Sequence, residues 1–243
     1  MSRSTGLALA ALLAGSAELI AQAQPPATHP RGTFSYNVTG LYQGEAMVPW
    51  ESEISVADSA ADGARLHVVD YRSRRGGDGF LYEYRLILTP ATGEFVVQHS
   101  NRGRAPGKYE LAVRNGRISG PITSDGTTRT LDAAVGMPAL PTFALGSVLA
   151  SRPLASGDTI RLSAMPLAAG VGLERVKPFT GVVRSDSLAR YLEKSPEPVW
   201  VVKGDAAYPA EFWIAKKDRM LLKAVIPQGS DGVMIEEYAG KGW

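Results

Sequence analysis

The chain lacks cysteine altogether and has only three histidines among its 243 residues. Without cysteine it forms no disulfide, no thiolate zinc site and no iron–sulfur cluster, and it has neither a cysteine nucleophile nor a lipidation cysteine. An excess of charge is missing too, because 26 lysines and arginines against 24 aspartates and glutamates give a net charge of +2. So small a net charge gives no strong steering field toward nucleic acid or an anionic membrane, and we expect no nucleic-acid partner.

Long apolar runs are also missing, except for one at the N-terminus. Arg3 gives a short positive segment, the apolar run GLALAALLAGSA follows, and Ala21 and Ala23 occupy the −3 and −1 positions before Gln24. This pattern predicts a secretory signal peptide over residues 1–23. The run is too short to span a bilayer stably. We therefore expect a periplasmic or extracellular protein with no membrane span after cleavage.

The rest of the chain has the pattern of a short leader and one β-rich domain. Residues 24–32 are rich in proline and polar side chains, and we expect a flexible leader. Over residues 33–243 apolar and polar residues alternate in short runs separated by turn residues, which predicts antiparallel strands. The predicted strands cover residues 33–42, 51–56, 64–72, 80–88, 95–99, 108–113, 129–134, 159–164, 174–184, 199–203, 210–215, 220–226 and 232–239.

The middle of the chain has a helical pattern instead. Leu145, Val148 and Leu149 follow one another at helical spacing, which predicts a helix over about residues 141–151 that ends before Pro153. A further short helical turn is predicted over residues 186–192. Many strands around one central helix predict a mainly β fold. We expect a large curved antiparallel sheet, an open or half barrel, with one covering helix.

The run FLYEYRLIL has an unusually aromatic face. That face carries Phe80, Tyr82, Tyr84, Leu86 and Leu88. Three environments accept such residues: a sealed core, a concavity lined for a ligand, or lipid around a membrane barrel. A sealed core is the default interpretation, because aromatic residues bury a large area in sheets of every kind. The sequence alone leaves the three environments open.

No stretch of the sequence carries a motif with a defined chemistry. It contains no HExxH zinc motif, no GxSxG nucleophile elbow and no phosphate-binding loop. His67 and Asp70 point to opposite faces of their strand, as do Glu236 and Glu237, so neither pair is expected to share a site. We therefore assign no catalytic residue, no metal site and no cofactor.

Three stretches of the second half resemble a known group of sequences. PLASGDTIRLSAMPL, PAEFWIAKKDRMLLKAVI and GVMIEEYAG, within about residues 140–240, resemble exported bacterial domains of the domain-of-unknown-function family 3108. That family is similar in architecture to the lipoprotein-localisation factors, which have an open curved sheet whose apolar concave side is plugged by a helix. The resemblance is one of turns and apolar positions. It implies a carrier for a hydrophobic ligand or acyl chain, or a scaffold of that shape, and it implies no reaction.

These observations predict an exported, non-enzymatic protein that binds a hydrophobic small molecule or a lipid on the concave face of its sheet. One alternative is a secreted, hydrolase-like enzyme whose loop-assembled site involves His67, Asp70 or an arginine cluster. Another is a structural partner in envelope assembly that pairs through an exposed strand edge. The sequence identifies no protein partner.

Two groups of residues are the candidate sites. Residues expected to line the concave face are Phe34, Tyr36, Tyr82, Tyr84, Leu145, Leu149, Phe212 and Trp213. Of these, Phe212 and Trp213 point to opposite faces of one strand, so only one of them can line the site. The second group, Arg72, Arg74 and Arg75, is expected at a hairpin tip. It could hold an anionic group, or it could be a solvated surface.

Overall fold

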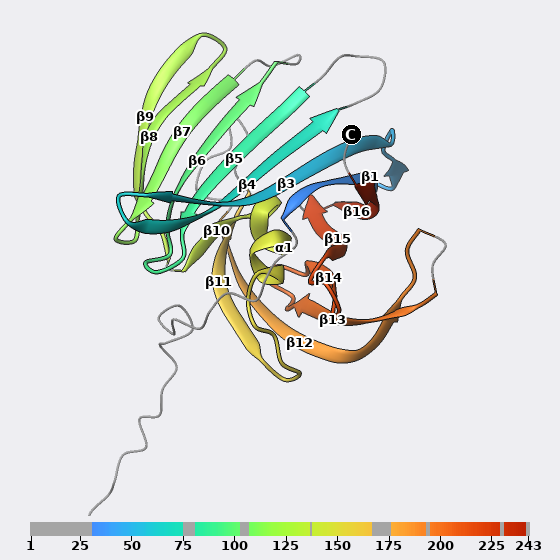
Figure 1. Cartoon of the computed structure of the whole chain (residues 1–243). Coiled ribbons are helices and arrows are strands. Elements are labelled where there is room, and N and C mark those ends of the chain that lie inside the picture. Colours follow the sequence, from blue (N-terminus) through green and yellow to red (C-terminus); the bar gives the residue numbers. More distant parts are fainter. Residues whose placement is uncertain are drawn as a thin grey trace, which may run out of the picture.

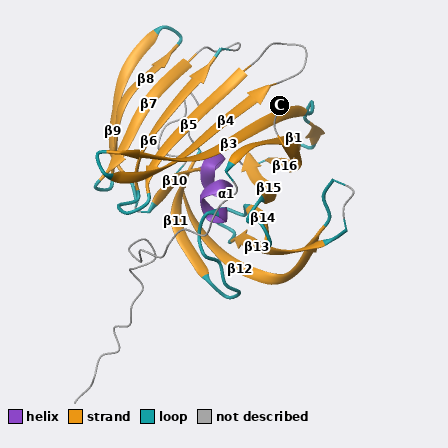
Figure 2. Ribbon diagram, in the orientation of Figure 1, coloured by secondary structure: helices purple, strands orange, loops and turns teal. Residues whose placement is uncertain are grey.

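A computed structural model of the chain describes residues 31–74, 81–102, 107–136, 138–166, 176–192, 195–228 and 231–241. The predicted signal peptide, nearly all of the leader, Arg75 and Phe80 lie outside these residues. Sixteen strands form one sheet, and α1 (Thr142–Ala150) lies inside its curve (Figures 1 and 2). The described residues therefore form the mainly β, curved sheet with one covering helix that the sequence predicts.

The strands follow the chain in regular succession. Their bounds are β1 Gly32–Tyr42, β2 Glu45–Ala46, β3 Trp50–Ala61, β4 Ala64–Arg74, β5 Leu81–Thr89, β6 Glu94–Asn101, β7 Gly107–Arg114, β8 Arg117–Ser124, β9 Thr127–Ala134, β10 Ala139–Pro141, β11 Thr159–Met165, β12 Lys177–Ala189, β13 Glu197–Gly204, β14 Glu211–Ala215, β15 Leu221–Gln228 and β16 Gly232–Lys241. Nearly every neighbouring pair is antiparallel. The exception is β10, which runs parallel to β11 with α1 in the connection between them.

Several hairpins are fixed by the same kind of two-residue turn. A polar residue and then a glycine both adopt positive φ, the conformation that a type I′ turn requires and that matches the twist of the two strands. These turns are Gln43–Gly44, Asp62–Gly63, Asn115–Gly116 and Asp125–Gly126, with φ between 49° and 81°. The local sequence thus sets the register of long strand pairs such as β3 and β4.

The sheet is open, and its two edges come from neighbouring parts of the chain. In the sheet order, β10 to β16 run from one edge to β1, and β3 to β9 run from β1 to the other edge. β9 and β10 are nevertheless consecutive in sequence. The segment between them is bonded to both regions: the Val135 N–H donates to the Gly116 carbonyl (2.8 Å) and the Ser163 N–H to the Pro138 carbonyl (2.7 Å). The sheet therefore coils until its edges approach each other.

The helix α1 is apolar on all sides. Its sequence, TFALGSVLA, has no charged residue, and seven of its nine residues are buried. A helix without a polar face is stable only when surrounded, so it must lie within the coil. A Cβ added at Gly146 would lie 2.7 Å from Leu221 Cδ2 and 3.1 Å from Phe212 Cδ1, so glycine permits a close approach to β14 and β15. The described helix is too short to cross a membrane.

One predicted element is wrong. Residues 186–192 form no helical turn, because β12 continues to Ala189 and pairs with β13 as far as Glu197. Leu188 lies near the end of β12, whereas Tyr191 and Leu192 follow the strand, so their spacing came from two different segments and not from one helical turn. No strand was predicted at the positions of β2, β8 and β10. The helix predicted over 141–151 is confirmed within a residue at each end.

Candidate functional site

Five of the eight predicted lining residues lie inside the coil. Phe34 and Tyr36 of β1, Leu145 and Leu149 of α1, and Phe212 of β14 belong to one buried core cluster. Their exposed fractions range from 0% to 6%, so they contact protein and not solvent. Whether they also contact a ligand stays a prediction. α1, which carries Leu145 and Leu149, lies on Phe212 of β14 within this core.

Phe212 and Trp213 point to opposite faces of β14, and only one of these faces is the inner one. Phe212 points inward and packs edge-on against Phe179, with ring centres 6.2 Å apart. Trp213 is only partly buried, and its indole N–H donates to the carboxylate of Glu211 on the same strand. Only Phe212 is therefore placed to line the interior.

The aromatic face of β5 lies against the helix. The ring of Tyr84 is 4.8 Å from that of Phe143 in α1 and 5.9 Å from that of Tyr71 on β4. Tyr82 and Tyr84 remain partly exposed, whereas Leu86 further along the strand is fully buried. The described part of this face is therefore core for most of its length and accessible only toward Tyr82.

His99 of β6 lies among these aromatic rings. Its ring stacks on Tyr84 at 4.3 Å and lies 4.9 Å from the Tyr109 ring. Its Nδ1 is 2.9 Å from the Glu83 carbonyl oxygen, which requires a proton on Nδ1, and its buried Nε2 has no hydrogen-bond partner. Burial lowers the pKa of His99. The side chain is therefore neutral at pH 7, with one lone pair left unsatisfied.

A carboxylic acid lies in the same interior, and sequence analysis did not single it out. Glu236 of β16 is 2% exposed, and its Oε1 accepts a hydrogen bond from the Tyr71 hydroxyl at 2.9 Å. Burial raises the pKa of Glu236 from 4.5 to about 7, which the Tyr71 hydrogen bond partly offsets. The only signal in the sequence was its alternation with Met234 and Tyr238, which did not reveal which face was inward.

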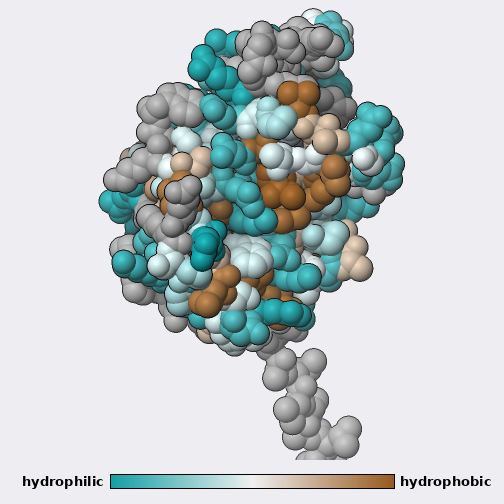
Figure 3. Space-filling model, turned by 90° about the vertical axis from the view of Figure 1, so that its right-hand side faces the viewer, coloured by the Kyte–Doolittle hydropathy of each residue, from teal (hydrophilic) through white to brown (hydrophobic). Residues whose placement is uncertain are grey.

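The end of the interior near Tyr238 is covered by the outer ends of β12 and β13. We call residues 185–192 and 195–199 the β12–β13 arm; it extends to the lower right in Figure 1. Its Tyr191 is buried on Tyr238, with ring centres 5.7 Å apart, and Tyr238 in turn contacts Tyr36 at 5.9 Å. Leu188 and Leu192 of the arm are 62% and 43% exposed. Hydrophobic side chains also gather on this side of the molecule in Figure 3.

Arg72 and Arg74, the described members of the predicted arginine cluster, lie on the outside of the sheet. Arg72 Nε is 3.8 Å from one carboxylate oxygen of Glu83, and Arg102 is 3.8 Å from the other. The Ser100 hydroxyl also donates to Glu83. Arg74 is exposed at the end of β4. Anion binding here stays a prediction, and one carboxylate already lies between two of the described guanidinium groups.

The residues of the enzyme hypothesis are not brought together. His67 Nδ1 lies 3.4 Å from Asp58 Oδ1, whereas Asp70 lies 3.6 Å from Arg85 on the other face of β4. Burial lowers the pKa of His67, and the hydrogen bond to Asp58 acts in the opposite direction. Among the described residues, no three histidine, aspartate or glutamate side chains are grouped so that they could hold a metal ion.

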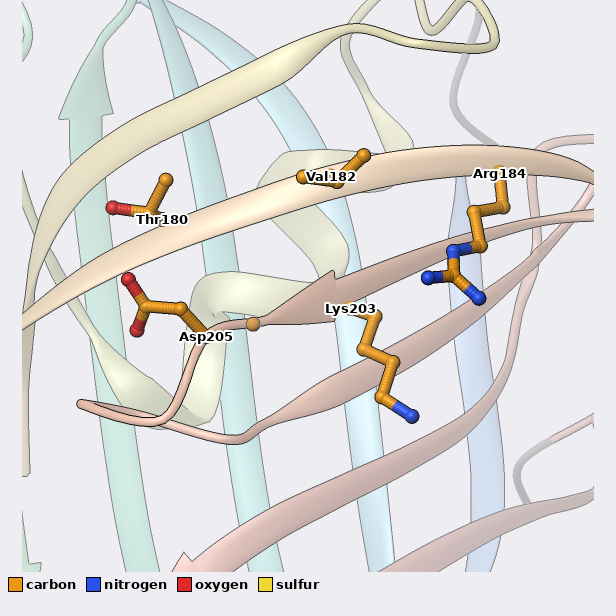
Figure 4. A pocket seen from close by; sticks show the side chains of 6 residues that line it. Thr180, Val182, Arg184, Lys203 and Asp205 are labelled. Atoms are coloured by element: carbon orange, nitrogen blue, oxygen red, sulfur yellow. The ribbon is translucent and has the colours of Figure 1, made fainter.

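Two shallow hollows lie away from α1 on the outer surface. One, of about 250 Å³, lies between β12 and β13. In Figure 4 its exposed residues, Val182, Arg184 and Lys203, project from these strands, and Lys203 is 3.8 Å from Glu211 in an ion pair. The other, of about 300 Å³, is lined by Ser100, Asn101, Gly107, Lys108, Thr123 and Gly126. Both are open hollows on the surface and do not enclose a ligand.

Comparison with known proteins supports the fold and no activity. No family model matches the chain, and no curated protein matches it. Among solved structures, it is similar to the crystal structure of a β-barrel-like protein of the domain of unknown function DUF1849 from Brucella abortus. The TM-score is 0.55 at 12% sequence identity, over 86% of this chain and 95% of that one. The chain thus has the fold of an uncharacterised β-barrel-like domain.

Proposed function

We propose that the protein is exported and non-catalytic, and that it binds a hydrophobic molecule, such as one with an acyl chain, between α1 and the concave face of the sheet. In this proposal α1 is a plug that occupies the ligand's place while the ligand is absent. The proposal includes the signal peptide over residues 1–23 and a periplasmic or extracellular location. It also includes the finer resemblance to family 3108 and the lipoprotein-localisation factors.

The observation that carries the proposal is the nature of α1. It is a nine-residue helix that buries apolar residues on every side yet has no side-chain hydrogen bond at its N-cap and no charged residue in its end turns. A helix this short is marginal on its own, so its stability comes from the apolar surface around it. An acyl chain offers the apolar wall the same kind of contact, so it can take the place of the helix.

A disulfide that ties α1 to the wall tests the proposal. Because the chain has no cysteine, the double substitution Gly146→Cys and Leu221→Cys introduces the only thiols, at a point where helix and sheet already touch. We expect the reduced form to bind a hydrophobic dye and oleate, and the oxidised form to lose most of that binding. The single variants Gly146→Cys and Leu221→Cys are the controls. Equal binding by the oxidised and reduced forms would refute the plug.

A second candidate is a structural partner in envelope assembly. The filled interior favours it, because in the ligand-free state the inner residues of α1, β1 and β14 are already sealed. The exposed edge strand β9 could pair with an extended segment of another protein. The two candidates differ in a simple measurement: an assembly partner binds no oleate in either redox state of the double variant.

A further inference from the structure

Two arginines meet where α1 ends against the β14–β15 turn (residues 216–220). Arg219 Nη2 donates to the backbone carbonyl of Arg152, the second residue after the helix, at 2.6 Å. The Arg219 guanidinium also lies over the ring of Trp200, 4.4 Å from its centre. Lys216 places its ammonium 5.7 Å from the same ring. Two cationic groups thus meet over one indole, and the backbone of a third cationic residue, Arg152, adjoins them.

These arginines have no carboxylate partner in the described part of the chain. Arg219 Nη1 is buried and has no hydrogen-bond partner, and the Arg152 guanidinium takes part in no ion pair. Asp218 is adjacent in sequence, but its carboxylate accepts a hydrogen bond from the Met220 N–H at 3.1 Å. Burial lowers the pKa of both arginines. Both side chains are only partly buried, and among the described residues neither guanidinium has a carboxylate partner, so an anion could be bound here.

The end of the helix accounts for only part of this arrangement. The negative end of the helix dipole favours a nearby cation, and the Arg152 carbonyl accepts one N–H of Arg219. That contact leaves Nη1 buried without an acceptor. Lys216 donates to the Ser185 carbonyl at 2.7 Å, which joins the turn to the β12–β13 arm, and its ammonium has no counter-ion among the described residues. One hydrogen bond satisfies the Arg152 carbonyl, so the end of the helix does not explain the remaining donors of Arg219 or the charge of Lys216.

The apolar neighbours of this turn belong to the interior. The Tyr36 hydroxyl donates to the Leu221 carbonyl at 3.0 Å, directly after the turn. Burial raises the pKa of Tyr191 to about 12, with the nearby carboxylates of Glu197 and Asp218 adding to the effect, so Tyr191 of the arm lies close to the turn. An anion held by Arg219 would therefore sit at the covered end of the apolar interior, beside Tyr191.

We propose that Arg219, with Arg152 and Lys216, binds the anionic head group of an amphiphile, a carboxylate or a phosphate, whose chain passes beneath the β12–β13 arm. The position of the chain rests on the proposed function, whereas the anion site rests on the arginines alone. A guanidinium pairs with either head group through two parallel N–H donors. The ligand class is then an anionic lipid or fatty acid and not a neutral one.

Three ligands with the same chain test the head group: oleate, 1-oleoyl-lysophosphatidate and oleyl alcohol. Titration calorimetry with the full chain should give an affinity about tenfold or more higher for the two anions than for the alcohol, as expected for charge-assisted hydrogen bonds. Arg219→Gln should abolish this preference and leave the affinity for the alcohol unchanged. Arg219→Lys should restore part of it. Arg161→Gln, at an exposed arginine of β11, is the matched control.

The outcomes separate the two proposals. Equal affinity of the wild type for oleate and oleyl alcohol, or an unchanged preference in Arg219→Gln, overturns the anion site.

If no amphiphile binds, the proposed function fails, and inorganic phosphate then decides the anion site. A rise in Tm with phosphate in the wild type but not in Arg219→Gln supports the site, and no rise in either overturns it. Without ligand, Arg219→Gln should lower Tm only slightly, because it removes the hydrogen bond to the Arg152 carbonyl and the contact with the Trp200 ring; a lower Tm with no change in anion binding overturns the anion site and indicates a structural role instead.

Discussion

The two sides of α1 meet the sheet with different chemistry. Toward β14 and β15, Gly146 lies directly on Leu221 and Phe212, with no polar group in the contact. We call this the apolar side. Toward β4 and β5, Phe143 packs on Tyr71 and Tyr84, with ring centres 6.1 Å and 4.8 Å apart. We call this the tyrosine side.

The difference between the two sides indicates which contacts of α1 respond to a change of pH. Burial of apolar groups does not depend on pH, and a tight contact resists any change of volume. The tyrosine side includes groups whose state can change: Tyr71 donates to the buried acid Glu236, and His99 behind Tyr84 has an unsatisfied nitrogen. We infer that the apolar side contributes more to the stability of α1, and that only the contacts of the tyrosine side change with pH.

The largest expected effect is a loss of stability, and it should differ between a phenylalanine on the apolar side and one on the tyrosine side. Phe212→Ala removes a ring that is 1% exposed, and we expect a loss of about 3–5 kcal/mol in the free energy of unfolding. Phe143→Ala removes a partly exposed ring, and the expected loss is about half as large. Urea unfolding at pH 6 measures both. Equal losses would remove the distinction between the two sides.

The next effect depends on pH and belongs to the tyrosine side. Folding raises the pKa of Glu236 from 4.5 to about 7, so the folded protein holds this proton more tightly than the unfolded chain. The resulting stability is complete below pH 4.5 and is lost as the pH rises through 7, by about 3 kcal/mol in total. We expect Glu236→Gln to be the more stable protein at pH 9 and to lose this dependence. Unfolding curves at pH 5, 7 and 9 provide the measurement, and parallel curves for both proteins would contradict the assignment.

A smaller effect is expected from the hydroxyl that bonds this acid. Tyr71→Phe removes the 2.9 Å hydrogen bond but keeps the ring on Phe143. We expect a loss of about 1 kcal/mol at pH 5 and about 2 kcal/mol at pH 9, because a hydrogen bond to a charged acceptor is the stronger one. The pKa of Glu236 should rise further, which a ¹³C carboxyl titration by NMR detects. An unchanged titration would show that the hydrogen bond is unimportant.

The smallest effect is expected at Arg72, which lies on the outer surface of the sheet and contacts neither side of α1. Arg72 is exposed and shares Glu83 with Arg102, so Arg72→Gln should change the unfolding free energy by less than about 0.5 kcal/mol. It should also leave oleate binding unchanged, in contrast to Arg219→Gln. A loss of anion binding in Arg72→Gln would move the anion site to the outer face, where the sequence predicted it.

The sequence predicted the elements that depend on the local spacing of apolar and polar residues. The period of two and turns such as Asn115–Gly116 led to most strands, and the spacing of Leu145 and Leu149 led to the helix. It could not reveal which face of β16 was inward, so the burial of Glu236 was missed. The unpaired state of Arg219 was also invisible, because it depends on which acids the coil brings near. The helical spacing of Leu188, Tyr191 and Leu192 was accidental, because β12 ends at Ala189, between the first of them and the other two.

The most direct test of the plug is hydrogen exchange of the α1 amides with and without saturating oleate. If the chain takes the place of the helix, the amides of residues 142–150 should exchange faster in the complex, while those of β4 and β15 keep their protection. If oleate binds and the α1 amides stay as protected as before, the helix has not moved, and the ligand binds elsewhere.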